Sequence, residues 1–343
     1  MSLVLLISIT GSACSALNSA KRKEVTEGLT LYETSEPLAG KLLFLVSTSP
    51  NPIAEPRRED AASVYEVTLA DLVIRKVTSA PNGEFISSAR GDSFVVQWPE
   101  YNRAASTHAI RAWGYSLPKH QSRSTTLYSD VNMPGSTVVI GNSAFFDVWS
   151  RPAGPGILRF NFDTGEKSFL DIPRGDAPAP HQAEDSANVL HVQGAWDSWY
   201  GYDVLTGHIG PVRCVKGVRG RHEFRCADGG YVFFEGSEAP IHGLRLVHSP
   251  ADSIDTKNGK VARNEVRVLK RFSWFSGGYY SLNQLSPCGR YALVCHNEPI
   301  FDGWAHTYYV VNVATGNLSV LMKDDVTRKA GGSVSWVWWL KSE

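Results

Sequence analysis

From Lys41 to the C-terminus, the chain alternates short apolar runs with clusters of turn residues. The runs are rich in β-branched and aromatic residues, which favour strands. No convincing window shows apolar residues at the 3.6-residue spacing of an amphipathic helix. This pattern predicts an all-β fold built from many short strands.

The runs fall into six sets of three or four, and one run is left over. The sets span residues 41–78, 84–128, 137–172, 188–215, 222–271 and 279–322. The leftover run, Ser333–Leu340, contains three tryptophans and lies almost at the end of the chain. Repetition of this kind is typical of folds that use one supersecondary unit many times.

Two turn signals recur at equivalent places in these sets. One lies between the first and second runs of a set, and the other lies between the third and fourth runs. The glycines of the first signal are Gly91, Gly141, Gly229 and Gly289, and those of the second are Gly165, Gly207 and Gly316. Glycine supplies the positive φ that tight hairpins require. Thr164 and Thr206 are 42 residues apart, which is the length of one four-stranded unit.

Two of these turns belong to a longer motif. Residues 286–295 read S-P-C-G-R-Y-A-L-V-C, and residues 227–235 read A-D-G-G-Y-V-F-F-E. Both segments resemble the S-P-D-G-[KR]-x-[IVL]-A-F repeat of TolB-type β-propellers, although Cys288 stands where the repeat has Asp. The resemblance covers residues 41–340 and implies a β-propeller of four-stranded blades. That repeat is structural, so it does not identify a ligand.

Counting the sets predicts how the ring closes. The first set lacks an innermost strand, and Ser333–Leu340 is a strand without a set. We therefore predict that Ser333–Leu340 pairs beside Lys41–Ser47 and completes one blade from both ends of the chain. Such a velcro closure removes unpaired strand edges. It gives a six-bladed propeller, and seven blades are the alternative if residues 25–35 contribute a strand.

The N-terminus carries a different signal. Leu3–Ile9 is apolar but shorter than the roughly 20 residues that span a bilayer, and small residues follow it. This predicts an export signal over residues 1–16, a tether over 17–40 and one propeller domain over 41–343. Cys14 follows Gly11-Ser12-Ala13 much as in a bacterial lipobox, which predicts a lipid anchor and a periplasmic or cell-envelope location. Plain cleavage and an ordinary first strand are the alternatives.

Composition narrows the class of partner. Hydrophobic residues make up 43% and charged residues 20%, as in globular proteins, and the formal net charge is zero. We expect no nucleic-acid partner, membrane contact only through a lipid anchor, and a monomer. Cys214 and Cys226 either form a disulfide or are buried thiols, and the sequence leaves both alternatives open.

In a propeller, one face collects the loops that join the second and third strands of each blade and the loops that join blades. We call it the loop face. Several of these loops are longer than a hairpin needs, and binding sites often lie on such loops. The candidate binding residues are Trp98, Trp149, Arg151, Trp196, Arg221, Trp274 and Trp304. Aromatic groups beside charged ones suit sugar rings or peptide side chains, and packing between blades is the alternative role.

Four histidines fall on or beside loops of the same face. They are His181, His222, His296 and His306. If three of them converge, they would bind a divalent metal, although their spacing matches no metal-binding motif. We predict no other cofactor. The alternative is that each histidine is solvated or hydrogen-bonded singly.

No nucleophile motif is present. The sequence contains neither a G-x-S-x-G elbow nor a phosphate-binding G-x-x-x-x-G-K-[ST] loop. We therefore expect an exported binding module whose loop face holds a protein or glycan partner. The alternative is a carbohydrate-active enzyme, a lyase or hydrolase, that uses the histidines or the aspartates Asp147, Asp197 and Asp302.

Overall fold

The structure is a computed structural model, and its regular elements are all strands within the residues that it describes. These residues are 22–26, 28–47, 62–80, 85–91, 93–102, 107–116, 119, 121–129, 137–148, 156–170, 179–182, 188–193, 199–211, 224–226, 228–235, 244–250, 254–255, 260–261, 266–272, 278–300, 303–324, 333–334 and 337–341. None of them belongs to a helix that could cross a membrane.

In the described part, the strands form six sheets of at least four strands each, numbered here in chain order. The first contains β28 (Ser333–Val334), β29 (Trp338–Leu340), β3 (Lys41–Ser47), β4 (Ala62–Thr68) and β5 (Val73–Ala80). The second contains β6 (Phe85–Arg90), β7 (Ser93–Asn102), β8 (Thr107–Ser116) and β9 (Gln121–Ser129). The third contains β10 (Thr137–Ile140), β11 (Ser143–Val148), β12 (Gly156–Asn161) and β13 (Lys167–Phe169).

The fourth sheet contains β14 (Ala179–Gln182), β15 (Val189–Gln193), β16 (Trp199–Asp203) and β17 (Ile209–Pro211). The fifth contains β18 (Phe224–Arg225), β19 (Tyr231–Glu235), β20 (Leu244–Ser249) and β23 (Arg267–Phe272), and a small pair, β21 (Ile254–Asp255) with β22 (Lys260–Val261), is inserted before β23. The sixth contains β24 (Tyr279–Leu285), β25 (Tyr291–Ile300), β26 (Gly303–Asn312), β27 (Leu318–Asp324), β2 (Leu29–Tyr32) and β1 (Arg22–Thr26).

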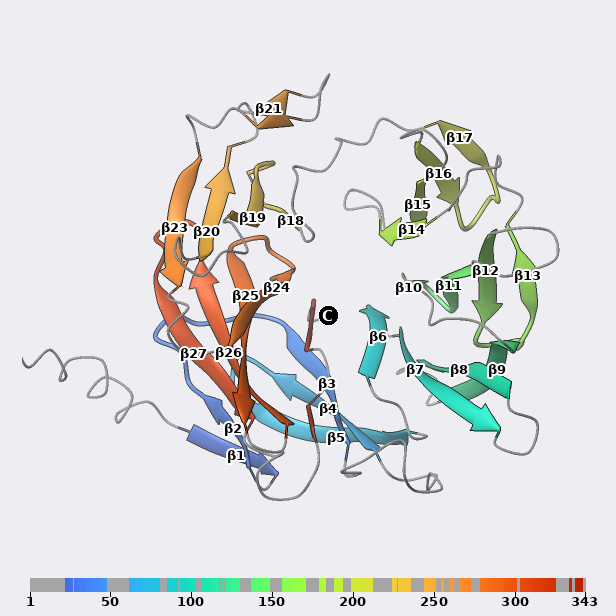
Figure 1. Cartoon of the computed structure of the whole chain (residues 1–343), viewed down its shortest axis with the longest axis horizontal. Helices are drawn as coiled ribbons and strands as arrows, with labels where there is room; N and C mark the ends of the chain where they lie inside the picture. Colours follow the sequence, from blue (N-terminus) through green and yellow to red (C-terminus); the bar gives the residue numbers. More distant parts are fainter. Residues whose placement is uncertain are drawn as a thin grey trace, which may run out of the picture.

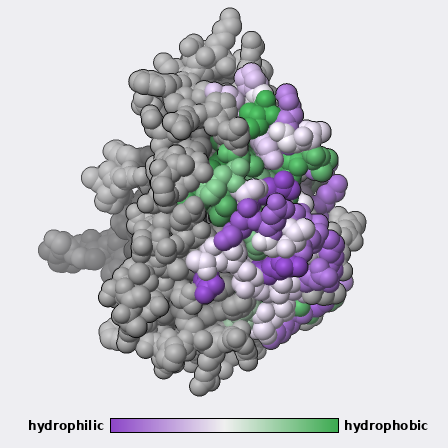
Figure 2. All heavy atoms as spheres, turned by 90° about the vertical axis from the view of Figure 1, so that its right-hand side faces the viewer, coloured by the Kyte–Doolittle hydropathy of each residue, from purple (hydrophilic) through white to green (hydrophobic). Residues whose placement is uncertain are grey.

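Figure 1 shows these sheets following one another around a centre, with β6, β10, β14, β18 and β24 as inner strands. Every described strand pair is antiparallel, and the second, third and fourth sheets are simple meanders. This is the arrangement of a β-propeller, and the predicted all-β fold class is confirmed. The described side chains on outer strand β9 are exposed at residues 121–124. Figure 2 views this side of the molecule, and its coloured residues are mainly hydrophilic with smaller hydrophobic areas.

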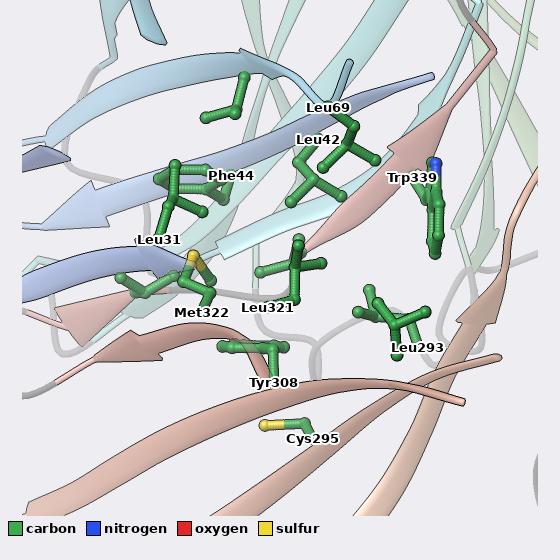
Figure 3. Close-up of a cluster of buried hydrophobic side chains, with 14 of the residues drawn as sticks. Leu31, Leu42, Phe44, Leu69, Leu293, Cys295, Tyr308, Leu321, Met322 and Trp339 are labelled. Atoms are coloured by element: carbon green, nitrogen blue, oxygen red, sulfur yellow. The ribbon is translucent and has the colours of Figure 1, made fainter. Parts of the chain in front are cut away.

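The core lies between neighbouring sheets because alternate residues of a strand point to opposite faces. On β3, Leu42 and Phe44 pack toward the sixth sheet, whereas Leu43 and Leu45 pack toward the second. Figure 3 shows the cluster between the first and sixth sheets, where Trp339 from the C-terminus lies among leucines of both sheets. Strand β3 therefore contributes to two apolar layers.

Both ends of the described chain join sheets that are distant in sequence. Strand β29 pairs with β3, and Trp338 lies opposite Leu43. At the other end, β2 pairs with β27 and β1 pairs with β2. Strands β1 and β2, which lie within the predicted tether over residues 17–40, thus extend the sixth sheet, and residues 33–40 lead from β2 to β3. In the described part these residues add to an existing sheet and form no further one.

The turn chemistry matches the sequence signals. All seven glycines of the two turn signals have positive φ, between 54° and 81°. In the turns between third and fourth strands, an Asx side chain also accepts two backbone N–H groups. The Asn161 Oδ1 atom accepts from Asp163 and Thr164, and Asp203 and Asn312 act in the same way. Side-chain acceptors of this kind stabilise a tight turn without help from distant residues.

Candidate functional site

The structure describes only part of the predicted loop-face site. Trp149, Arg151, Trp196, Arg221, Trp274, His222 and Cys14 lie outside the described residues, as do Asp197, Asp302 and Cys214. Trp98 and Trp304 lie on β7 and β26, where the backbone is described. The predicted convergence of the tryptophans and arginines therefore stays a prediction.

Two long hairpins project from the loop face. The pairing of β7 with β8 continues for five pairs beyond the last β6–β7 pair, from Trp98–Arg111 to Asn102–Thr107. The pairing of β25 with β26 continues for three pairs beyond the last β24–β25 pair, to Ile300–Gly303. The first projection carries Trp98 and the second carries Trp304. Paired strands hold these backbone positions more firmly than an irregular loop would.

His181 occupies a strand instead of the loop that the sequence predicts. It lies on β14, the inner strand of the fourth sheet, opposite His191 on β15. Two of the remaining loop-face candidates, His296 and His306, belong to the sixth sheet.

The strand register separates His296 from His306. In the β25–β26 pair, His296 lies opposite Thr307, and Asn297 lies opposite His306. Because directly opposite residues share a face and successive residues alternate, the two histidines point to opposite faces of the sheet. The predicted convergence of His296 with His306 on one metal ion is therefore wrong for this pair.

Each of these histidines has a packing role instead. The His296 ring stacks on Tyr280, with ring centroids 4.3 Å apart, and burial lowers the pKa of His296. The His306 Nδ1 atom lies 3.1 Å from the Asp324 Oδ2 atom, which also accepts the backbone N–H of Val334. His306 and Asp324 thus connect β26, β27 and β28. Of the three aspartates that the enzyme alternative would use, the structure describes Asp147, which is buried on β11.

A cluster of chemically versatile side chains lies in the fifth sheet, away from the loop face. Cys226 follows β18, Asp228 lies in the turn before β19, and His248 lies on β20. One ligating atom from each of the three lies within 4.8 Å of the other two. The His248 Nε2 atom is 3.0 Å from the Asp228 Oδ2 atom. Cysteine, aspartate and histidine are the residue types that bind zinc in proteins.

Local backbone geometry creates this cluster. The Asp228 Oδ1 atom accepts the backbone N–H of Gly230 at 2.9 Å, which orients the carboxylate. A Cβ atom at Gly230 would lie 2.8 Å from the His248 Nε2 atom and 2.4 Å from the Ser249 carbonyl oxygen. Only glycine therefore lets the turn approach β20 this closely. In the β19–β20 register, Val232 lies opposite His248, which brings the histidine to the level of the turn.

The cluster borders a cavity of about 520 Å³ between the fifth and sixth sheets. The lining residues include Cys226, Asp228, Arg267, Arg290, Tyr291 and Asn312. The Arg267 guanidinium donates to the carbonyl oxygens of Val313 and Ala314, so it holds the sheets together. The cavity thus gives the cluster of Cys226, Asp228 and His248 an open side, and we call these three residues the Cys226 cluster. Cys226, Cys288 and Cys295 are not in disulfides, while the predicted partner Cys214 is not described.

No protein-family model and no curated protein matches this sequence. Among solved structures, TolB from Acinetobacter baumannii matches with 13% identity and a TM-score of 0.45, covering 88% of this chain and 67% of TolB. An acylaminoacyl peptidase from Pyrococcus horikoshii matches with 12% identity and a TM-score of 0.44, covering 85% of this chain and 45% of the peptidase. An oligogalacturonate lyase in complex with manganese matches with 14% identity and a TM-score of 0.39, covering 76% of this chain and 74% of the lyase.

The likeness to these structures concerns the fold. The chain is similar to TolB and to other β-propellers, and it spans less than half the length of the peptidase. The activities named for the peptidase and the lyase belong to those proteins.

Proposed function

We propose that this protein is a propeller-based binding module whose loop face holds a protein or glycan partner. The observation that supports this role is the pair of hairpins that extend beyond their sheets and carry Trp98 and Trp304. The second and sixth sheets, which carry these hairpins, each share apolar clusters with both neighbouring sheets, and this packing supplies a rigid base. Rigid presentation reduces the conformational entropy that the hairpins lose when a partner binds.

The residue types on these hairpins suit such a partner. Trp98 is followed on β7 by Pro99 and Tyr101, and Trp304 lies opposite Pro299 on β25. Tryptophan and tyrosine offer a large apolar face together with a polar edge, which fits both sugar rings and peptide side chains. Glu298 also lies on the second hairpin, where its exposed side chain adds a negative charge.

Array binding with matched variants tests this proposal. Wild-type protein, the double variant Trp98→Ala/Trp304→Ala and the control Leu205→Ala would be screened on glycan and peptide arrays. Leu205 is exposed and belongs to the turn between β16 and β17, at the other end of its sheet from the loop face. We expect the control to keep every wild-type signal and the double variant to lose at least about tenfold in affinity, as hot-spot aromatics do. Equal binding by all three proteins, or no binding by wild type, would contradict the proposal.

We also propose export with a lipid anchor on Cys14. Metabolic labelling with palmitate would compare the wild-type chain with Cys14→Ser, and loss of the label is the expected result. Unchanged incorporation would refute the anchor and leave the binding role to be judged on the arrays alone.

The carbohydrate-active alternative has less support from geometry. It needs histidines or aspartates that converge on the loop face, but His296 and His306 point to opposite faces of one sheet. Cleavage of an array glycan by wild-type protein, abolished in His222→Ala, would favour the enzyme over the binding module.

A further inference from the structure

The Cys226 cluster contains a buried nitrogen without a regular hydrogen bond. The His248 side chain is 7% exposed, and its Nε2 atom makes no hydrogen bond of ordinary geometry although the Asp228 carboxylate lies 3.0 Å away. Leaving a buried polar atom in this state is energetically costly. We propose that Cys226, Asp228 and His248 bind a divalent transition-metal ion of the zinc type.

The distances are close to those that zinc requires. Ligand atoms around one tetrahedral zinc ion lie about 3.3–3.5 Å apart, given Zn–S and Zn–N bonds of about 2.3 and 2.0 Å. The three ligating atoms here lie within 4.8 Å of one another, and the histidine–aspartate distance is 3.0 Å. Small side-chain rotations bring the three atoms to the required separation. The backbone turn, held by the Gly230 N–H on Asp228, does not need to move.

The cluster is not a by-product of the repeated turn. In the sixth sheet, Ser286 and Cys288 occupy the places of Cys226 and Asp228, since Gly289 donates to the Ser286 carbonyl as Gly229 donates to the Cys226 carbonyl. Val311 occupies the place of His248, because it lies opposite Ala292 as His248 lies opposite Val232. The equivalent turn thus shares this glycine hydrogen bond but lacks the three-ligand set. It provides an internal control.

Three protein ligands leave one position of a tetrahedral ion for a fourth ligand. Cys226 and Asp228 both line the cavity between the fifth and sixth sheets, so water or a ligand oxygen can reach the ion. On binding, the Cys226 thiol loses its proton to solvent and a metal–thiolate bond forms. The thiolate and the Asp228 carboxylate together balance the charge of a divalent ion.

Cobalt titration of untagged, chelator-stripped protein tests the site. Co²⁺ replaces zinc in such sites, and a thiolate ligand produces a charge-transfer band in the near ultraviolet. We expect one equivalent of Co²⁺ per chain with this band, displaced by one equivalent of Zn²⁺. Cys226→Ser should lose the band. Mutating a residue that only hydrogen-bonds a metal ligand lowers metal affinity about 10–100-fold, and His248→Gln should lower the affinity for Co²⁺ by more than this.

Two further variants separate ligation from folding. Asp228 is 57% exposed in its side chain, so Asp228→Asn should fold normally, with an unchanged circular dichroism spectrum, and bind Co²⁺ more weakly. Cys288→Ser removes the exposed cysteine of the equivalent turn and should leave the titration unchanged. The proposal fails if wild type binds less than one equivalent, if the band survives in Cys226→Ser, or if Cys288→Ser loses it.

Discussion

Replacing Trp339 by alanine should destabilise the whole ring, because this side chain joins the first and sixth sheets. It is 1% exposed, and its Nε1 atom donates to the Ala39 carbonyl oxygen at 2.9 Å. Its ring stacks near Tyr291 of the sixth sheet, with centroids 6.2 Å apart, while its backbone pairs with β3 at Leu42. Its backbone N–H donates to the Gln284 side chain of β24.

The expected loss can be estimated from these contacts. Truncating a buried tryptophan to alanine costs about 3–5 kcal/mol through lost burial and the cavity left behind. The lost hydrogen bond to Ala39 adds about 1 kcal/mol, so Trp339→Ala should lower the free energy of unfolding by about 4–6 kcal/mol. That is a large part of the about 5–15 kcal/mol that stabilises a typical protein. Trp339→Phe keeps most of the apolar contact and should cost about 1–2 kcal/mol.

Urea unfolding followed by far-ultraviolet circular dichroism measures these differences. Leu205→Ala is a matched control for removing a large apolar side chain, because Leu205 is 74% exposed. It should change the free energy of unfolding by less than about 0.5 kcal/mol. A loss below about 1 kcal/mol for Trp339→Ala would refute the inference that this residue joins the two sheets.

Deleting residues 333–343 removes both C-terminal strands from β3, and we expect the protein to lose its cooperative urea transition or to unfold at lower urea than Trp339→Ala. Burial raises the pKa of the Cys295 thiol, whereas Cys288 is exposed. An alkylating reagent should therefore label Cys288 in the folded protein and Cys295 only after unfolding, as mass spectrometry can show. Burial lowers the pKa of His296, so the folded state binds this proton less readily than the unfolded state. Stability should fall as the pH drops from about 7.5 to about 5.5, and it should fall less in His296→Gln.

Different outcomes would contradict these expectations. An unchanged transition after the deletion would show that the ring does not depend on its C-terminal strand. Labelling of Cys295 at the rate of Cys288 would show that this core opens readily. If His296→Gln and wild type lost equal stability on acidification, the pH dependence would arise from other groups.

The sequence predicts strands well where the local signal is strong. The predicted run Lys41–Ser47 coincides with β3, because its aromatic and aliphatic residues are buried on both faces. Strand β14 escapes prediction, since Ala179–Gln182 contains proline and no β-branched residue, and only its place in the fourth sheet makes it extended. Strand β2 falls within residues 25–35, which the sequence offers only as an alternative strand, and its partner β27 lies almost at the other end of the chain. Pairings of such long range have no local signature.

The candidate sites depend on register, which composition does not encode. His296 and His306 are ten residues apart on one hairpin, and a shift of one residue in the turn would place them on the same face. The Cys226 cluster depends equally on register, because His248 reaches the turn only through its position opposite Val232. The A-D-G-G turn and a histidine on the third strand were visible in the sequence. Their proximity was not.

The position of the proposed metal site follows from the way the fifth sheet is built. Its inner strand β18 makes only two described pairs with β19, whereas the inner strand β24 of the sixth sheet makes six with β25. Within the described residues, the fifth sheet therefore has fewer backbone pairs on its inner strand. A metal ion bound by Cys226 after β18 and by His248 on β20 would tie that strand to the third strand of the sheet. Because an ion that binds only the folded state raises stability, zinc should protect this sheet from local opening more than it protects the sixth.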